Sequence, residues 1–433
     1  MKILFINPPV YDFALYDLWM KPLGFLYLAN LFKKNNIEIF YFDFMDRNHP
    51  FYKKLKTDKK YGTGKFFFEV VEKPEVYKNV PKKFKRYGLP LPLFEEFISK
   101  QNKPDFIFIT SGMTYWYLGV KEIINFCKKF FNSIPIILGG PYTTFCKKHA
   151  EKLGADYVFS GKDLKSFIKI FNEKYYLNLK EYNWWELEPA WELYKKLSYS
   201  CIKTSSGCPF SCYYCGIKLL EPLIFQREPD SVVEEIFKSV EKYCIEDIAF
   251  YDDALFYKFN SHLKIILEKI IKSKINVRFH TPNGIHPRYI TSEAGYILKE
   301  SNFVTIRLSL ETILKKRQKE SDFKVTFKEF ENAIEILTNN GFTKENIGVY
   351  ILIGLPEQKP QEVIETIKII KNYPCKIKLA EYSPIPGTKD FVYAKNLYPF
   401  IQLDEPLLHN NSIFPLWDFK NKWEIIEEIK NLI

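Results

Sequence analysis

The sequence predicts an α/β protein in which an N-terminal, doubly wound parallel sheet precedes a partial (β/α)6 barrel. Two observations carry this prediction. Short apolar runs alternate with segments of helical periodicity in both halves of the chain, and a loop with the spacing C-x3-C-x2-C follows the first strand of the second half. The chain has 433 residues, 46% of them hydrophobic and 27% charged, so it is long enough for two or three globular domains.

The N-terminal half has the pattern of a parallel sheet. Its strand-like apolar runs are residues 3–6, 37–42, 105–110, 134–138 and 157–159. Its helical patterns are residues 23–32, 120–131, 143–153 and 164–171. Strands that alternate with helices form a parallel sheet covered on both faces, with ligands at the carboxyl ends of the strands. We therefore expect a Rossmann-like domain over residues 1–171.

Two segments interrupt this rhythm. Residues 45 to about 104 are rich in lysine and proline and have weak periodicity, which predicts an insertion with some helix near residues 92–100. Residues 172–199 form a linker that contains Trp184-Trp185 and Trp191, and we expect these aromatic side chains to pack between the two domains.

The second half continues the alternation and predicts a six-stranded barrel over residues 200–390. The strand-like runs are residues 201–204, 248–251, 277–280, 305–310, 348–353 and 377–381. The helical patterns are residues 231–243, 261–271, 292–300, 327–339 and 361–372. Barrels of this kind place their chemistry at the carboxyl ends of the strands. For residues 391–433 we expect a less regular C-terminal extension.

Three cysteines after the first barrel strand predict an iron–sulfur cluster. Cys208, Cys212 and Cys215 offer three thiolates on one short loop, whereas cluster ligation normally uses four. A [4Fe-4S] cluster on these residues would leave one iron open for another ligand. A structural zinc site is the alternative, but zinc would need a fourth ligand at a recognisable spacing, and none lies near in sequence.

The cysteine spacing, Tyr214 before the last cysteine and the position after the first barrel strand together resemble the radical S-adenosylmethionine superfamily. The resemblance implies that Cys208, Cys212 and Cys215 are the catalytic metal ligands. It also implies that the open iron chelates S-adenosylmethionine. An electron from the cluster then cleaves this cofactor to methionine and a 5′-deoxyadenosyl radical.

Other residues at successive strand ends resemble the cofactor-binding elements of this superfamily. They are Tyr214, Asp252, Asp253, Thr281, Asn283, Arg307, Ser309, Glu311 and Gly354. The match at Asp252-Asp253 is loose, because Leu255 stands where the D-D-x-F element has its aromatic residue. The period of two along a strand places Arg307 on the same face as Ser309 and Glu311, where it could meet a carboxylate.

The N-terminal half resembles the cobalamin-binding domain that precedes many radical enzymes. Four segments carry the resemblance: residues 7–9, 21–28, 139–142 and 154–157. It implies a cobalamin held by Pro8, Leu23, Ser111, Gly112, Gly139 and Gly140. Glycines at a strand end let the backbone approach a bulky ligand closely.

Two features of this half leave the cofactor contacts open. The aromatic residues Tyr115, Trp116 and Tyr117 could pack on the flat corrin ring or belong to the core. The D-x-H-x-x-G motif that supplies an axial histidine in other cobalamin proteins is absent. Any bound cobalt would therefore lack a histidine from that motif, a feature that many members of the radical branch share.

The leading functional hypothesis is a cobalamin-dependent radical methyltransferase that acts on an unactivated carbon or phosphorus of an unidentified substrate. A cobalamin-associated radical cyclase or rearrangement enzyme without methyl transfer is an alternative. Methylthiolation of RNA would need a second three-cysteine cluster, but the N-terminal domain holds only Cys127 and Cys146. A non-enzymatic, metal-stabilised binding protein is the remaining alternative.

Charge and hydropathy bear on partners and location. The net charge is +11, which leaves nucleic acid open as a partner, but the lysines are spread along the chain and do not favour it. No stretch approaches the roughly 20 apolar residues of a membrane span, and the first residues lack a signal-peptide cleavage site. We expect a cytoplasmic enzyme without a membrane partner. Its substrate would be a small molecule or a peptide, and its external electron donor a flavodoxin or ferredoxin.

Overall fold

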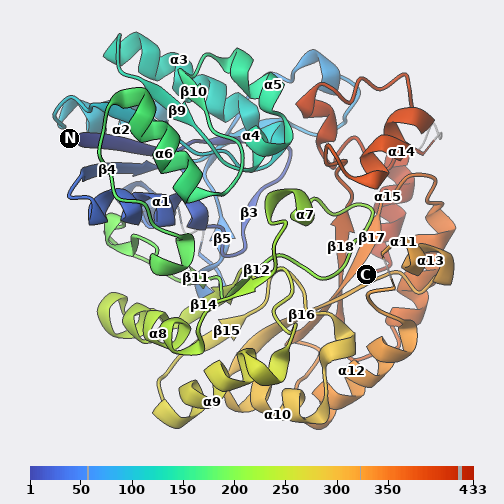
Figure 1. Ribbon diagram of the computed structural model, residues 1–433. Coiled ribbons are helices and arrows are strands. Elements are labelled where there is room, and N and C mark those ends of the chain that lie inside the picture. Colours follow the sequence, from blue (N-terminus) through green and yellow to red (C-terminus); the bar gives the residue numbers. More distant parts are fainter. Residues whose placement is uncertain (56–57, 322, 418–421) are drawn as a thin grey trace. The chain divides into compact units, whose positions relative to one another are not determined.

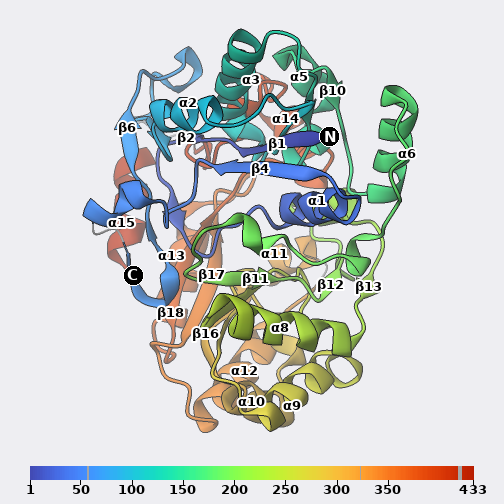
Figure 2. The ribbon, with the colours of Figure 1, turned by 90° about the vertical axis from the view of Figure 1, so that its left-hand side faces the viewer.

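The computed structural model describes residues 1–55, 58–321, 323–417 and 422–433 (Figures 1 and 2). The chain divides into two compact units. Unit 1 contains residues 1–198 and 403–409, and unit 2 contains residues 199–402 and 410–433. Within the described ranges, no helix has the length and apolar character needed to cross a membrane.

Unit 1 contains the predicted parallel sheet of five strands. In spatial order they are β10 (Tyr157–Val158), β9 (Ile136–Leu138), β8 (Phe106–Ile109), β1 (Lys2–Asn7) and β4 (Glu38–Asp43). All neighbouring pairs are parallel. Strand order reverses at β1, with β4 on one side and β8 on the other. A crevice for a ligand is therefore expected at the carboxyl ends of β1 and β8.

Helices cover both faces of this sheet (Figure 2). They are α1 (Leu23–Lys34), α2 (Leu91–Ser99), α3 (Tyr117–Phe131) and α6 (Leu164–Tyr175). The face under α1 and α6 is aromatic: Phe5 and Phe108 stack at 5.1 Å, and Phe32 of α1 and Phe171 of α6 pack against them. Such rings bury large apolar areas and stabilise the sheet.

The predicted helix over residues 143–153 is wrong as a single helix. It is broken into α4 (Pro141–Phe145), α5 (Lys147–Ala150) and a 3-10 turn (Glu151–Leu153). Cys146 lies between the first two with φ −128° and ψ 43°, which is outside the helical region, so the backbone changes direction there.

The segment predicted as an insertion has structure of its own. The predicted helix is present as α2. Before it, β2 (Val10–Asp12), β7 (Lys85–Tyr87) and β6 (Phe68–Val70) form a small antiparallel sheet, and β3 (Tyr16–Asp17) pairs with β5 (Gly64–Lys65).

The tryptophan-rich segment contacts α1 of unit 1. Trp184 lies 5.9 Å from the ring of Tyr27, and the backbone amide of Ala190 donates to the carbonyl of Leu26. A distant stretch also belongs to unit 1. The Glu405 carboxylate accepts a hydrogen bond from Tyr117 on α3 at 3.0 Å.

Unit 2 contains the predicted six-stranded parallel sheet, with its strands in sequence order. They are β11 (Ser200–Ile202), β14 (Asp247–Phe250), β15 (Arg278–His280), β16 (Phe303–Glu311), β17 (Ile347–Ile353) and β18 (Lys376–Glu381). The five predicted helices are present as α8 (Pro229–Tyr243), α9 (Leu263–Ser273), α10 (Ser292–Glu300), α12 (Phe327–Asn339) and α13 (Pro360–Ile370). Figure 1 shows α9, α10, α12 and α13 along the outside of the curved sheet.

Four further helices of unit 2 were not predicted: α7 (Ile217–Leu220), α11 (Lys315–Glu320), α14 (Lys389–Leu397) and α15 (Lys422–Asn431). The first two flank the cysteine loop and the end of β16.

The predicted alternation along β16 is wrong at its last residues. The register of β16 against β17 shifts between Ser309 and Glu311, and Glu311 has φ 70°. A bulge of this kind re-aims the following side chain. The period of two therefore does not place Arg307 and Glu311 on one face. The Arg307 guanidinium instead packs over Gly348 of β17, where an added Cβ would lie 2.7 Å from Nη1.

The two glycines after β9 differ in how well they would tolerate a side chain. Gly140 has φ +107°, and a Cβ there would lie 2.3 Å from the Ser111 carbonyl oxygen, whereas a Cβ at Gly139 would meet nothing within 4 Å. We expect Gly140→Ala to lower the free energy of unfolding by about 2 kcal/mol or more, and Gly139→Ala to change it by about 0.5 kcal/mol at most. Thermal unfolding of both variants checks this. Equal melting temperatures would contradict the assigned contact.

Candidate active site

The cysteine loop is anchored on both sides within unit 2. Gly207 begins it with φ +76°, and a Cβ there would lie 2.6 Å from the Leu223 carbonyl oxygen, so a side chain would clash. The Gly207 amide donates to the Glu221 carboxylate at 3.0 Å. Tyr213 donates its amide to the carbonyl of Glu320 at the end of α11 and accepts from the amide of Asp390 in α14.

The three thiols of the loop lie close enough to affect one another electrostatically. Burial raises the pKa of the Cys208 and Cys212 thiols to about 11 and also raises that of Cys215. Each thiol raises the pKa of another of the three, and the Lys324 ammonium lowers the pKa of all of them. The Lys324 ammonium therefore lies within electrostatic range of all three thiols.

The three thiols of the loop do not form a single-ion site in the part of the chain that the structure describes. Among the described residues, no group of three His, Cys, Asp or Glu side chains has the close spacing that one metal ion needs. In a cubane cluster each thiolate binds a different iron, so its ligands stand farther apart than those of one ion. All eight cysteines are free thiols, so none of the three is held in a disulfide.

A buried ion pair lies beside the thiols. The carboxylate of Glu311, at the bulged end of β16, pairs with the ammonium of Lys324 and accepts a hydrogen bond from the Tyr214 hydroxyl. Lys324 Nζ lies 3.0 Å from the Tyr214 oxygen. Burial lowers the pKa of Lys324, but the adjacent Glu311 carboxylate outweighs burial and raises the pKa. The lysine is therefore charged.

Sequence reasoning missed Lys324. It stands between Phe323 and Val325, just before the capping box in which Thr326 and Glu329 begin α12. A single lysine before a helix is usually a surface residue, and only its burial beside Glu311 marks it as part of the site.

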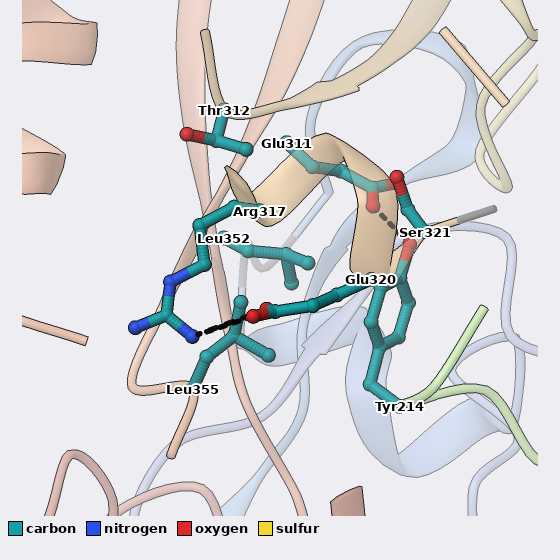
Figure 3. A pocket seen from close by; sticks show the side chains of 8 residues that line it. All are labelled: Tyr214, Glu311, Thr312, Arg317, Glu320, Ser321, Leu352 and Leu355. Carbon is teal, nitrogen blue, oxygen red and sulfur yellow. Dashed lines mark hydrogen bonds and ion pairs between the residues drawn. The ribbon is translucent and has the colours of Figure 1, made fainter. Parts of the chain in front are cut away.

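A small cavity adjoins this ion pair (Figure 3). Its lining residues come from the cysteine loop, the end of β16, the α11 region and the end of β17: Tyr214, Glu311, Thr312, Arg317, Glu320, Ser321, Leu352 and Leu355. Arg317 is held by Glu320 at 3.1 Å and by Glu362 at 3.0 Å. Charged side chains and the leucine side chains of Leu352 and Leu355 both line it.

The acidic pair after β14 is engaged by the residues that follow the neighbouring strand β11. Asp252 is buried and accepts hydrogen bonds from the amide and hydroxyl of Thr204 and from the hydroxyl of Ser205. Asp253 pairs with Lys203 at 3.6 Å. Asp253 also raises the pKa of Cys208 and Cys215, so it lies within electrostatic range of the cysteine loop.

The residues after β15 join neighbouring strands. The Asn283 amide donates to the carbonyl of Tyr251, and the Thr281 hydroxyl accepts from the Arg307 amide at 3.0 Å. Ser309 is packed tightly, since a Cβ at Gly284 would lie 2.5 Å from its hydroxyl oxygen. The structure thus places these residues at the barrel mouth with internal partners.

The turn after β17 is closed by one glutamine. Gln358 Oε1 accepts from the amides of Gly354 and Leu355, at 2.7 and 3.2 Å, and its Nε2 donates to the carbonyl of Leu352. Gly354 has φ +98°, and a Cβ there would lie 3.2 Å from the nitrogen of Pro415.

The predicted cofactor residues of unit 1 gather at the carboxyl edge of its sheet. The Ser111 hydroxyl donates to the Gly139 carbonyl at 2.7 Å and so ties the ends of β8 and β9 together. Gly112 packs on Trp116, where a Cβ would lie 2.8 Å from the ring. Pro8 and Leu23 are buried after β1 and at the start of α1. Space is open above Gly139 and also above Gly24 of α1.

The aromatic trio after β8 belongs to the core of unit 1. Tyr115 is buried, the Trp116 indole donates to Asp12 at 2.8 Å, and Tyr117 bonds to Glu405. Met113, just before the trio, is half exposed instead. A corrin ring at this edge would therefore meet a thioether and bare glycine backbone rather than three stacked aromatics.

The three histidines of unit 1 are all held by internal partners. His49 accepts from the Phe51 amide, His149 bonds to Tyr142, and His409 bonds to Thr114 and to the Leu403 carbonyl. This agrees with the missing D-x-H-x-x-G motif.

Fold and site together define a class: an enzyme with an open parallel barrel and a three-thiolate cluster loop at the mouth of that barrel. Residues 202–370 match the family model of the radical SAM superfamily, so this part of the chain is a radical SAM domain. The matched residues contain all three cysteines and the Glu311–Lys324 pair.

Known proteins resemble this chain over most of its length. An uncharacterised methyltransferase of Pyrococcus horikoshii is 22% identical over 335 residues, which cover 69% of this chain and 71% of the relative. The solved structure of the radical S-adenosylmethionine methyltransferase TsrM from Kitasatospora setae has a TM-score of 0.70 at 13% identity, covering 100% of this chain and 89% of that one. The cobalamin-dependent radical enzyme OxsB has a TM-score of 0.60 at 11% identity, covering 93% and 56%. At these identities the two structures show a shared fold.

Proposed function

We propose that this protein is a cobalamin-dependent radical S-adenosylmethionine methyltransferase that acts on an unactivated carbon or phosphorus. The observation that carries the proposal is the loop of Cys208, Cys212 and Cys215, whose thiols face the buried Glu311–Lys324 pair at a barrel mouth. The relatives support methyl transfer, since TsrM and the Pyrococcus horikoshii protein are both described as methyltransferases.

The Glu311–Lys324 pair matches the charges of S-adenosylmethionine. The amino acid end of this cofactor carries an ammonium and a carboxylate side by side. A buried carboxylate and a buried ammonium can exchange their mutual contact for contacts to these two groups, so that no charge is left without a partner. Leu352 and Leu355 supply an apolar wall beside them, next to the turn closed by Gln358.

The carboxyl edge of the unit 1 sheet fits a cobalamin. Gly139 and Gly24 leave open space where other residues would project a side chain, and the Met113 side chain is half exposed. The residues Pro8, Leu23, Ser111, Gly112 and Gly140 fix the backbone of that edge.

When bound, the cluster would supply the electron that breaks a sulfonium bond of S-adenosylmethionine, and cobalamin would carry the methyl group. The residues of this chain then have separate tasks. Cys208, Cys212 and Cys215 hold three irons and leave the fourth open. Glu311 and Lys324 orient the amino acid end of the cosubstrate. Tyr214 holds the Glu311 carboxylate between the loop and β16.

Anaerobic reconstitution tests the proposal. The purified chain is treated with iron and sulfide, then with hydroxocobalamin and S-adenosylmethionine labelled in its methyl group. We expect a brown protein that retains cobalamin through gel filtration and transfers the label to cobalamin after reduction. A colourless protein that binds zinc would favour a metal-stabilised binding protein. Retained cobalamin without any label transfer would favour a cyclase or rearrangement enzyme.

A substitution at Gly139 tests the cobalamin edge separately. Gly139 lacks a positive φ and faces open space, so Gly139→Leu should fold normally while its side chain occupies the space of the corrin. We expect at least about fivefold weaker cobalamin binding, since overpacking costs about 1–3 kcal/mol. Cobalamin titration followed by absorbance measures it, with unchanged iron content as the control. Unchanged affinity would show that cobalamin does not bind at this edge.

We propose a small molecule or a peptide as the substrate and the cytoplasm as the location. All eight cysteines are free thiols, which suits a reducing compartment. Nucleic acid is not favoured as a partner because lysines are spread along the chain.

A further inference from the structure

An exposed surface beside the cysteine loop combines lysines with apolar side chains. It is formed by two segments of unit 2, residues 216–224 with α7 and residues 387–395 with most of α14 (Figure 1). The two segments touch, because a Cβ at Gly387 would lie 2.8 Å from a methyl carbon of Leu219. We call this surface the loop–α14 patch.

Large apolar side chains are unusually exposed in the loop–α14 patch. Leu223 is 77% exposed and Val392 is 55% exposed, and Leu219, Ile224 and Tyr393 are also exposed. Single exposed apolar residues are common, but a cluster of them marks an interaction surface.

The charges of the patch have one sign. Its exposed charged residues are Lys218, Lys389 and Lys395, whereas its two carboxylates, Glu221 and Asp390, are buried. Glu221 is neutralised by Lys203. An apolar centre with a basic rim fits a partner that presents an acidic rim around an apolar centre.

The patch also adjoins the cluster loop. The Lys218 ammonium bonds to Ser211, which lies beside Cys212, and the Lys389 ammonium lies 4.2 Å from the Tyr213 ring centroid. Cys215 is exposed, so the edge of a cluster held there would be close to the surface of the patch. A partner seated on the patch would contact the protein next to the cluster.

We propose that the loop–α14 patch docks a small acidic electron-transfer protein that reduces the cluster. This inference rests on the proposed function, because cleavage of S-adenosylmethionine consumes an electron that the chain does not itself supply. One electron leaves the reduced flavin or iron–sulfur centre of the partner, which is oxidised, and enters the oxidised cluster. Lysines on the patch attract the acidic partner and raise the rate of encounter.

Stopped-flow reduction of the reconstituted enzyme by a photoreduced, acidic flavodoxin tests the docking. In the variant Leu223→Asp/Lys389→Glu/Lys395→Glu we expect the second-order rate to fall at least about tenfold and to lose most of its salt dependence. The matched control is Tyr296→Asp/Lys272→Glu, which changes an exposed aromatic residue of α10 and an exposed lysine of α9. The control should keep the wild-type rate. Dithionite, a small reductant, should drive cofactor cleavage equally in all three proteins.

Three results would overturn the proposal. The patch variant could accept electrons from flavodoxin as fast as the wild type, or it could lose dithionite-driven cleavage in parallel. It could also keep the flavodoxin rate and lose only product formation, which would assign the patch to a peptide substrate. Failure of the proposed function looks different, since the wild type would then cleave no S-adenosylmethionine even with dithionite while flavodoxin still reduced its cluster.

Discussion

Cys212→Ala should abolish both the iron–sulfur cluster and the cleavage of S-adenosylmethionine. Cys212 is the middle one of the three cysteines that we propose as cluster ligands, and its Sγ lies 3.5 Å from the Ser321 carbonyl oxygen. Two remaining thiolates are too few to hold a cluster that normally has four ligands. We expect iron to fall from about four per chain toward zero and 5′-deoxyadenosine to become undetectable.

Cys244→Ala is the matched control for this substitution. Cys244 is an exposed free thiol at the end of α8, so its loss removes a cysteine without touching the loop. The control should keep the iron content and the turnover of the wild type. Wild-type turnover in Cys212→Ala would refute the cluster assignment, and loss of iron in both variants would point to a general fault in reconstitution.

The fold was predictable because its signals are local. Residues 3–6 of β1 include no polar residue because a parallel strand is buried on both faces, and the same holds for all of β8. The cysteine loop was predictable for the same reason, because its three cysteines lie within eight residues and their spacing can be recognised directly in the sequence. The six barrel strands were found in order for the same reason.

The rest of the site depends on contacts that have no local pattern. Glu311 and Lys324 are separated by 13 residues and meet only because the bulge at Ser309 re-aims Glu311. The helix α11 has the sequence KKRQKE, has no apolar periodicity, and is positioned by the bonds of Arg317 to Glu320 and Glu362. The return of residues 403–409 to unit 1 is a long-range contact of the same kind.

Lys324→Met should weaken S-adenosylmethionine binding about 30-fold or more. The substitution removes the buried ammonium that we assign to the carboxylate of the cosubstrate and leaves Glu311 without its ion-pair partner. Truncating one member of a buried, hydrogen-bonded charge pair at an interface costs about 2–5 kcal/mol. Equilibrium dialysis of labelled S-adenosylmethionine against the reconstituted variant measures the dissociation constant. Lys324→Arg keeps the charge and should stay within about tenfold of the wild type.

The double variant Glu311→Gln/Lys324→Met separates recognition from structure. If the pair only stabilised the fold, removing both charges together would relieve the unpaired carboxylate and restore binding, as buried pairs replaced by neutral groups often do. If Glu311 binds the ammonium of S-adenosylmethionine and Lys324 binds its carboxylate, the double variant should bind more weakly than either single variant. Thermal unfolding of all four proteins without S-adenosylmethionine supplies the structural baseline. If the double variant regained wild-type affinity, Glu311 and Lys324 would not be part of the S-adenosylmethionine binding site.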